Sequence, residues 1–371
     1  MIPSRSISHA FALLLPVLLL AGGCKDKPED NTPQYDRAAL ATQLADGLIR
    51  PRYERALQSA ERLQAHVDAF AADPGLAGLD SLQAALRDLR HAWLSVSAFE
   101  FGPGATYYLR QAINTFPADA NQVEANMRSG NWDLDLAQNA DARGLPALDY
   151  LLHGSGADDA AILAGFTAPA DSALRITGLR NLVDDVQGLL QQAVTGWGSY
   201  RSTFIANTGT DVSSATSLIV NQFNLDLEQL KNVRIGIPLG KSTLGQPVLA
   251  NVESRYGGYS VDLAITQLRA LRDLFQGKTT AGIDGYGLDD ALLAIEAQRD
   301  GRPLKDVIFD GFDSAIAALQ AIPDPLEATI ASNPTLVNTA YTQLQRLIVF
   351  TKTDMPSSLG ILITYTDNDG D

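Results

Sequence analysis

The chain contains few of the residues that catalytic and metal centres most often use. Its 371 residues include one cysteine and four histidines. A single cysteine excludes an intramolecular disulfide, and few histidines disfavour a catalytic zinc centre, which needs three protein ligands and usually includes histidine. The sequence also lacks a Gly-x-Ser-x-Gly stretch, the nucleophile turn of α/β hydrolases. These shortages argue against zinc, serine and cysteine hydrolases.

Positive charge is scarce as well. The chain has 28 lysines and arginines against 43 aspartates and glutamates, which gives a net charge of −15. A strongly acidic protein is repelled by phosphate backbones and by anionic membrane surfaces. We therefore expect no nucleic-acid partner. The charge is compatible with a bound cation, although an acidic surface also serves solubility.

The N-terminal residues have the pattern of a bacterial export signal. Residues 1–23 carry Arg5 as their only charge and an apolar run over residues 10–20, which is too short for a membrane span. The run ends in Leu-Ala-Gly-Gly before Cys24, which resembles a lipobox. We expect Cys24 to be lipidated, residues 24–34 to form a tether, and the protein to face the periplasm, anchored to the outer membrane of a bacterial envelope.

Leucine spacing of three and four residues recurs along the rest of the chain and predicts an all-α fold. The first long helix begins at Tyr35, and Pro51 should break or kink it. The polar stretch 207–210 separates two helical halves of similar order. We predict two related helical bundles, residues 35–206 and residues 207–371, the second ending in an acidic arm.

The stretch 143–154, Arg-Gly-Leu-Pro-Ala-Leu-Asp-Tyr-Leu-Leu-His-Gly, is the most distinctive motif. A glycine followed by Pro146 indicates a turn that enters a helix. Asp149 and His153 are four residues apart, so their side chains lie on one helix face. They are either part of a site or a polar pair at the start of a buried helix.

This motif resembles the signature of the imelysin-like family, also classified as peptidase M75. The family pattern is Gly-x-His-x-x-Glu, then an aromatic residue, two leucines and a glycine. The chain keeps Gly144 and residues 150–152 and 154, but has Pro146 in place of histidine and Asp149 in place of glutamate. Other parts of the chain are also similar to the family: the helix ending Phe99–Pro103, the turn Ile237–Gly240, the segment Glu253–Ser260 and the terminal Leu-Gly and Asp-Gly-Asp.

The resemblance implies an all-helical, two-bundle periplasmic lipoprotein associated with iron uptake, with a site between the bundles. The ligand-binding positions that it implies are Trp93, Glu100, Gly144, Pro146, Asp149, His153, Glu253, Ser254 and Arg255. Because Pro146 offers no side-chain ligand, the departure from the pattern argues against the family's metal chemistry.

Two hypotheses about function remain, besides a purely structural role. The first is a non-enzymatic binding lipoprotein that holds a metal ion, a small metal complex or an envelope protein between the bundles. The second is a metallopeptidase-type hydrolase with carboxylate ligands, Asp149 with Glu100 or Glu253. An oxygen-rich site at Asp149 and Glu100 would suit a hard cation such as iron or calcium.

Overall fold

The computed structural model describes residues 34–168 and 172–365, which belong to one compact unit, Pro33–Asp371. The predicted signal peptide, Cys24, most of the tether and the acidic residues after Tyr365 lie outside the described residues. Within the described part, no helix is both long and apolar enough to cross a membrane.

The fold is all-α, as the leucine spacing predicts. Its only strands within the described residues are β1 (Gln298–Arg299) and β2 (Arg302–Pro303), which pair antiparallel across an Asp-Gly turn. The helices of the first half are α1 (Arg37–Thr42), η1 (Gln43–Ile49), α2 (Arg50–Ala72), α3 (Leu76–Leu94), α4 (Pro103–Thr106), α5 (Leu109–Asn114), α6 (Ala120–Ser129), η2 (Ala137–Asn139), α7 (Gly144–Asp149), η3 (Tyr150–Gly154), α8 (Asp159–Thr167) and α9 (Ser172–Ala206).

The helices of the second half are α10 (Ala215–Glu228), η4 (Gln229–Gly236), α11 (Ile237–Leu239), η5 (Leu249–Asn251), α12 (Ser260–Phe275), α13 (Leu288–Ala294), α14 (Leu304–Gln320), α15 (Leu326–Ser332), α16 (Pro334–Ile348), η6 (Val349–Asp354) and α17 (Met355–Leu359).

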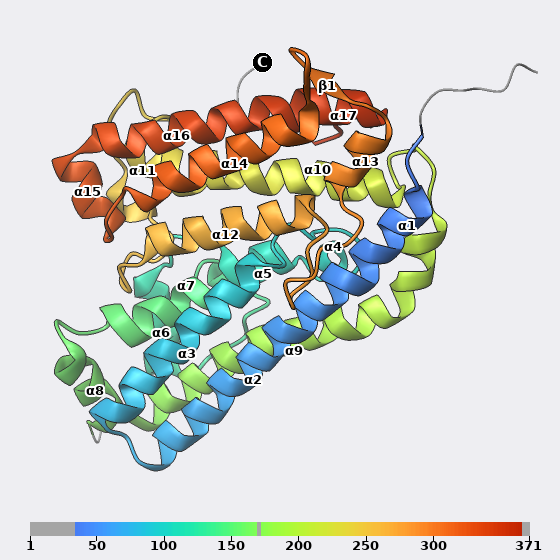
Figure 1. Ribbon diagram of the computed structural model, residues 1–371. Helices are drawn as coiled ribbons and strands as arrows, with labels where there is room; N and C mark the ends of the chain where they lie inside the picture. The colour runs from blue at the N-terminus through green and yellow to red at the C-terminus, as the bar shows by residue number, and fades with distance from the viewer. Residues whose placement is uncertain (1–33, 169–171, 366–371) are drawn as a thin grey trace, which may run out of the picture. The chain divides into compact units, whose positions relative to one another are not determined.

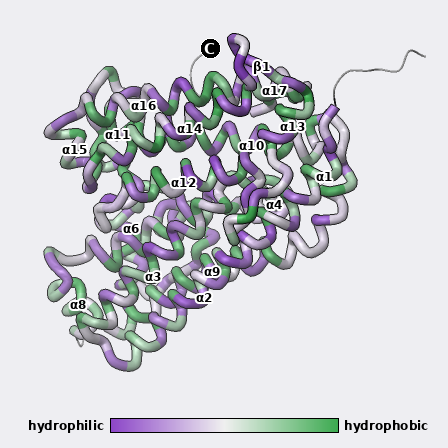
Figure 2. The backbone as a smooth tube through the Cα atoms, in the orientation of Figure 1, coloured by the Kyte–Doolittle hydropathy of each residue, from purple (hydrophilic) through white to green (hydrophobic). Residues whose placement is uncertain are grey.

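The longest helices pack in two groups. Helix α2 packs against α3 and α9, and α14 packs against α16 and α12. Helix α12 also contacts α3, so it joins the two groups (Figure 1). Apolar and polar residues alternate along the helices (Figure 2), and the apolar residues form one connected core.

The helix that begins the described chain does not stop at Pro51. It runs from α1 through the π-helix η1 directly into α2, which has this proline in its first turn. A proline inside a helix lacks an N–H and its ring clashes with the carbonyl four residues earlier. A wider π turn before the proline gives that carbonyl room, and the helix continues. Two other π-helices, η4 and η6, likewise end just before Pro238 and Pro356.

The predicted boundary at residues 207–210 falls in the connection between α9 and α10. Residues on both sides of it belong to the same compact unit. The division into two related bundles stays a prediction.

The last described residues form an extended arm, residues 361–365, without regular secondary structure. The side-chain amide of Asn221 on α10 forms hydrogen bonds with the backbone of this arm, as a neighbouring strand would. Its Nδ2 donates to the carbonyl oxygen of Leu362 at 3.0 Å, and its Oδ1 accepts from the N–H of Thr364 at 2.7 Å.

Candidate functional site

The motif helix α7 is buried along its whole length and continues as the π-helix η3. Both motif glycines permit close approaches. Gly144 has φ +69°, and a Cβ there would lie 2.3 Å from the carbonyl oxygen of Ile113. A Cβ at Gly154 would lie 2.1 Å from the ring of Tyr256. The motif thus fits tightly between α5 and the 253–260 segment, and neither glycine can be replaced without displacing a neighbour.

Asp149 is 1% exposed, and its carboxylate binds the 253–260 segment. The hydroxyl of Ser254 donates to Oδ1 at 3.1 Å, and the N–H of Tyr256 donates to Oδ2 at 3.1 Å. The guanidinium of Arg90 lies 3.9 Å from Oδ1. Both oxygens of Asp149 therefore already accept hydrogen bonds within the protein.

Arg90 of α3 is the charge that the buried carboxylate faces. It is 1% exposed and donates to the backbone carbonyls of Leu145 at 2.9 Å and Glu253 at 3.2 Å. Burial disfavours the charged form of Arg90, but the nearby carboxylates of Asp149 and Glu253 outweigh burial and raise its pKa. A permanently charged arginine at this position ties α3 to the motif and to the 253–260 segment.

Glu253 is held by a second arginine. Arg234 of η4 approaches its Oε2 at 2.6 Å through Nε and its Oε1 at 3.3 Å through Nη2. The side-chain amide of Asn114 donates to Oε1 at 2.6 Å. Both Glu253 and Asn114 are buried, so this carboxylate, too, is fully engaged within the protein.

His153 and Arg255 lie at the edges of this network. The imidazole of His153 lies 6.2 Å, centroid to centroid, from the ring of Tyr259, and its buried Nε2 has no hydrogen-bond partner within the described residues. Burial lowers the pKa of His153. Arg255 is exposed and lies over the Tyr256 ring at 5.7 Å.

The predicted residues converge only in part. Asp149, Ser254 and Glu253 belong to one buried network, with Gly144, Pro146 and His153 beside them. Glu100 lies apart from it and accepts a hydrogen bond from the backbone N–H of Arg110 at 3.2 Å. Burial raises the pKa of Glu100, although the charge of Arg110 opposes that shift.

The donor set does not fit the metal centre that the sequence predicts at Asp149 and Glu100. Within residues 34–168 and 172–365, no three His, Cys, Asp or Glu side chains are grouped so that they could hold a metal ion. Pro146 supplies no ligand atom, both oxygens of Asp149 already accept hydrogen bonds, and the nearest charge to Asp149 is an arginine. The charge of Arg90 would also repel a bare cation bound at this carboxylate.

A cavity of about 240 Å³ lies next to this network, between α3, α5 and the helix α10–η4. Trp93 forms one wall, and Asn114 and Arg234, which hold Glu253, form another. The remaining lining residues are Ser97, Arg110, Gln111, Thr115, Phe116, Asp226, Gln229 and Val233.

The charges on the cavity wall differ in how they are neutralised. Arg234 is paired with Glu253, and Asp226 accepts hydrogen bonds from the hydroxyl of Ser97 at 3.0 Å and from the amide of Gln267 at 2.8 Å. Arg110 instead donates to the carbonyl of Ser97 at 2.9 Å and to Gln222 at 3.1 Å. Arg110 forms no ion pair within 4 Å among the described residues, although its charge acts on the nearby Glu100.

Sequence reasoning missed Arg90, Arg110, Asn114 and Arg234. Only Arg90 had a local signal, because it lies four residues after Leu86 and three before Trp93, on the apolar face of α3. A charged residue at such a position is buried with a partner more often than it is solvated. The other contacts join residues too far apart in the sequence for spacing to reveal.

Comparisons with known proteins identify the family and the fold. Residues 49–349 match the model of the peptidase M75 family, imelysin. The iron-regulated protein A of Synechococcus elongatus is 22% identical over 304 residues, which is 77% of this chain and 76% of that protein.

Two crystal structures share the fold. An iron-regulated protein A precursor from Parabacteroides distasonis superposes with a TM-score of 0.73 at 18% identity, covering 91% of this chain and 97% of the other. An imelysin-like protein from Psychrobacter arcticum gives a TM-score of 0.67 at 17% identity, covering 89% and 97%. Since the family match spans most of the chain, this protein belongs to the imelysin family.

Proposed function

We propose that this chain is a non-enzymatic, envelope-anchored binding protein linked to iron uptake. Its ligand site is the cavity beside Trp93, and its ligand is a small iron complex with anionic groups. The names of its relatives, iron-regulated protein A, support the connection to iron. The cavity supports a binding role for the protein.

The observation that carries the proposal is Arg110. It lines the cavity as a half-buried guanidinium whose hydrogen-bond partners are neutral oxygens. A guanidinium in such a place binds a carboxylate or another oxyanion through charge-assisted hydrogen bonds. The indole of Trp93 adds an apolar wall, as in most small-molecule sites.

The motif itself supports binding over hydrolysis. A catalytic metal needs protein ligands and an open coordination position. The carboxylates of Asp149 and Glu253 are instead already engaged in internal hydrogen bonds and ion pairs. The motif in this chain therefore has a structural role. The contacts of Asp149, Arg90 and Glu253, which we call the seam, hold α3, α7 and the 253–260 segment together. Through Asn114 and Arg234 these contacts also fix the cavity wall.

Calorimetric titration with ferric citrate, citrate alone and calcium chloride tests this function. We expect ferric citrate to bind, and Arg110→Gln to weaken its binding by about tenfold, because a partly buried charge-assisted hydrogen bond is lost. Arg128→Gln is the matched control, since it removes the same charge from an exposed side chain away from the cavity.

Two outcomes contradict the proposal. Binding of calcium with no binding of the ferric complex would replace it with a cation site. Cleavage of an unfolded protein substrate that stops on addition of a chelator would favour the alternative hydrolase with carboxylate ligands.

The anchoring part of the proposal rests on the sequence before the described residues. A lipobox that ends at Cys24 supports lipidation there, and the acidic chain then attaches through its acyl groups rather than through its charge. We place the protein on the periplasmic face of the envelope, most simply at the outer membrane.

A further inference from the structure

A second cavity, which no motif residue lines, has an unusual balance of charge for so acidic a protein. Its volume is about 540 Å³, and it opens between α2, α3, α12 and the segment after α12. We call it the basic groove. Its lining residues are Arg52, Arg55, Ser59, Arg62, Asp88, His91, Ala92, Ser95, Ala270, Asp273, Lys278, Thr279, Thr280 and Gly282.

Three arginines of α2 share one helix face in this groove. Arg52, Arg55 and Arg62 are spaced by three and seven residues, and all three line the cavity. Like charges three residues apart destabilise a helix unless something neutralises them. No aspartate or glutamate stands three or four residues from any of the three, so α2 itself does not provide that neutralisation.

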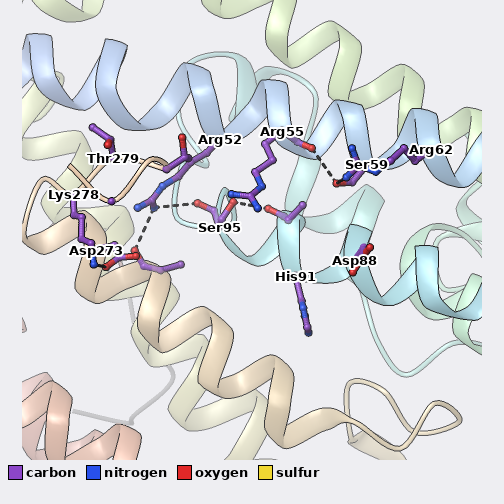
Figure 3. A pocket seen from close by; sticks show the side chains of 14 residues that line it. Arg52, Arg55, Ser59, Arg62, Asp88, His91, Ser95, Asp273, Lys278 and Thr279 are labelled. Carbon is purple, nitrogen blue, oxygen red and sulfur yellow. Dashed lines mark hydrogen bonds and ion pairs between the residues drawn. The ribbon is translucent and has the colours of Figure 1, made fainter. Parts of the chain in front are cut away.

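The deepest of the three arginines is buried. Arg52 is 4% exposed, and its Nη1 donates to the backbone carbonyls of Ser95 at 3.3 Å and Ala270 at 3.2 Å. Burial lowers its pKa to about 10, so it remains charged at neutral pH. Figure 3 shows its side chain reaching from α2 toward α3 and α12.

The other basic groups of the groove are accessible. Arg55 and Arg62 are exposed, and no carboxylate of the described residues lies within salt-bridge distance of either. The Nη2 of Arg62 donates to the hydroxyl of Ser59 at 2.8 Å, which orients the guanidinium. Figure 3 places both on the α2 side of the groove.

The acids of the groove offset only part of this charge. Asp273 lies 3.8 Å from Lys278, and its negative charge also acts on Arg52. Asp88 is exposed on the α3 wall. Four permanent cations thus face two carboxylates, and the hydroxyls of Thr279 and Thr280 add neutral donors. The groove carries a local positive charge on a chain whose net charge is −15.

We propose that the basic groove is a binding site for a small molecule that carries at least two oxyanion groups, carboxylate or phosphate. Arginine forks bind both kinds of group bidentately. The deep group meets Arg52 and Lys278, and the outer group meets Arg55 and Arg62. Arg52 and Arg62 are ten residues apart, about 15 Å along the helix axis, so an extended ligand with separated anionic groups fits better than a single ion. The cavity has the size of ordinary ligand sites.

Calorimetric titration with sodium pyrophosphate and with citrate tests the groove and distinguishes its two anion classes. We expect at least one of them to bind. The double variant Arg55→Gln/Arg62→Gln should weaken that binding by about tenfold. Both side chains are exposed and make no ion pair within the described residues, so this variant should fold normally, which its circular dichroism and melting temperature will check.

A charge-matched variant separates a built site from general electrostatics. Arg128→Gln/Arg346→Gln removes two exposed arginines outside the groove and gives the same net charge. It should leave the affinity unchanged. Asp273→Asn removes the acid beside Lys278 and should strengthen binding several-fold.

The site is refuted if neither anion binds, or if the matched control weakens binding as much as the groove variant does. The two proposals can fail separately, because Arg110 lines the cavity beside Trp93 and not the groove, whereas Arg55 and Arg62 line the basic groove and not that cavity. Weaker binding of ferric citrate by Arg110→Gln tests the proposed function, and weaker binding of pyrophosphate or citrate by Arg55→Gln/Arg62→Gln tests the groove.

Discussion

Replacing Asp149 by alanine tests whether this motif carboxylate is structural or a ligand. The change removes the acceptor for the Ser254 hydroxyl and for the Tyr256 N–H, and leaves Arg90 without its closest carboxylate. All of these groups are buried or nearly so. Removing one partner of a buried ion pair costs about 3–5 kcal/mol, because the other charge stays buried without compensation.

Urea denaturation of the wild type and of Asp149→Ala measures this cost as a fall in midpoint at unchanged slope. Asp149→Asn keeps the shape and one acceptor oxygen, so it should cost less, about 2 kcal/mol. Asp141→Ala is the control, since it removes an exposed carboxylate close in sequence to the motif and should change stability by less than about 0.5 kcal/mol.

A double-mutant cycle measures how much of this loss of stability belongs to the ion pair of Arg90 and Asp149. If Arg90→Met is combined with Asp149→Ala, the double variant should be less destabilised than the sum of the single variants, because no isolated charge remains. A loss below about 1 kcal/mol in Asp149→Ala, accompanied by lost binding of the ferric complex, would refute the structural assignment and make this carboxylate a ligand.

Two other predictions concern anchoring and pH. Cys24→Ser should release the protein from membranes to the soluble fraction, and continued partitioning into detergent extracts of membranes would contradict lipidation. Burial is the main cause that raises the pKa of Asp289 from 3.8 to about 6, and the charge of Asp290 is the second. The folded state therefore binds the carboxyl proton of Asp289 more tightly than the unfolded chain does. The resulting contribution to the free energy of unfolding is complete below about pH 4 and is lost as the pH rises through about 6. Asp289→Asn should abolish that slope and stabilise the protein at pH 7 by about 1 kcal/mol after solvent screening, and an unchanged urea midpoint at pH 7 would contradict it.

The long helices could be predicted because they bury stripes rich in leucine that the sequence shows directly. The extent of the first helix could not be predicted from Pro51 alone. A proline ends a helix unless the preceding turn widens, and the widening at η1 depends on tertiary packing of Leu44 and Leu48, both fully buried. The sequence gives the proline but not the contacts that hold the helix together across it.

The candidate site shows the same limit at longer range. The motif itself stands out by its glycines, its leucines and its acid. Its partners do not, because Ser254 lies 105 residues from Asp149 and Asn114 lies 139 from Glu253. One useful signal was present in the pattern: Arg52 and Arg90 each occupy a position on the apolar face of their helix. Each was found buried, one in the seam and one in the basic groove.

Arg90 and Arg234 neutralise the buried acids around the motif from within the protein. Pro146 stands in the histidine position of the family pattern. Asp149, whose side chain is shorter than the family's glutamate, accepts hydrogen bonds from Ser254 and Tyr256, and Arg90 neutralises its charge. Glu253 is likewise paired with Arg234. The carboxylates of Asp149 and Glu253 therefore stabilise the fold, although acidic residues outnumber basic residues in the chain. Most of the charges still available to a ligand in the two cavities are guanidinium groups, which is why we propose an anion or an anionic complex as the ligand of each.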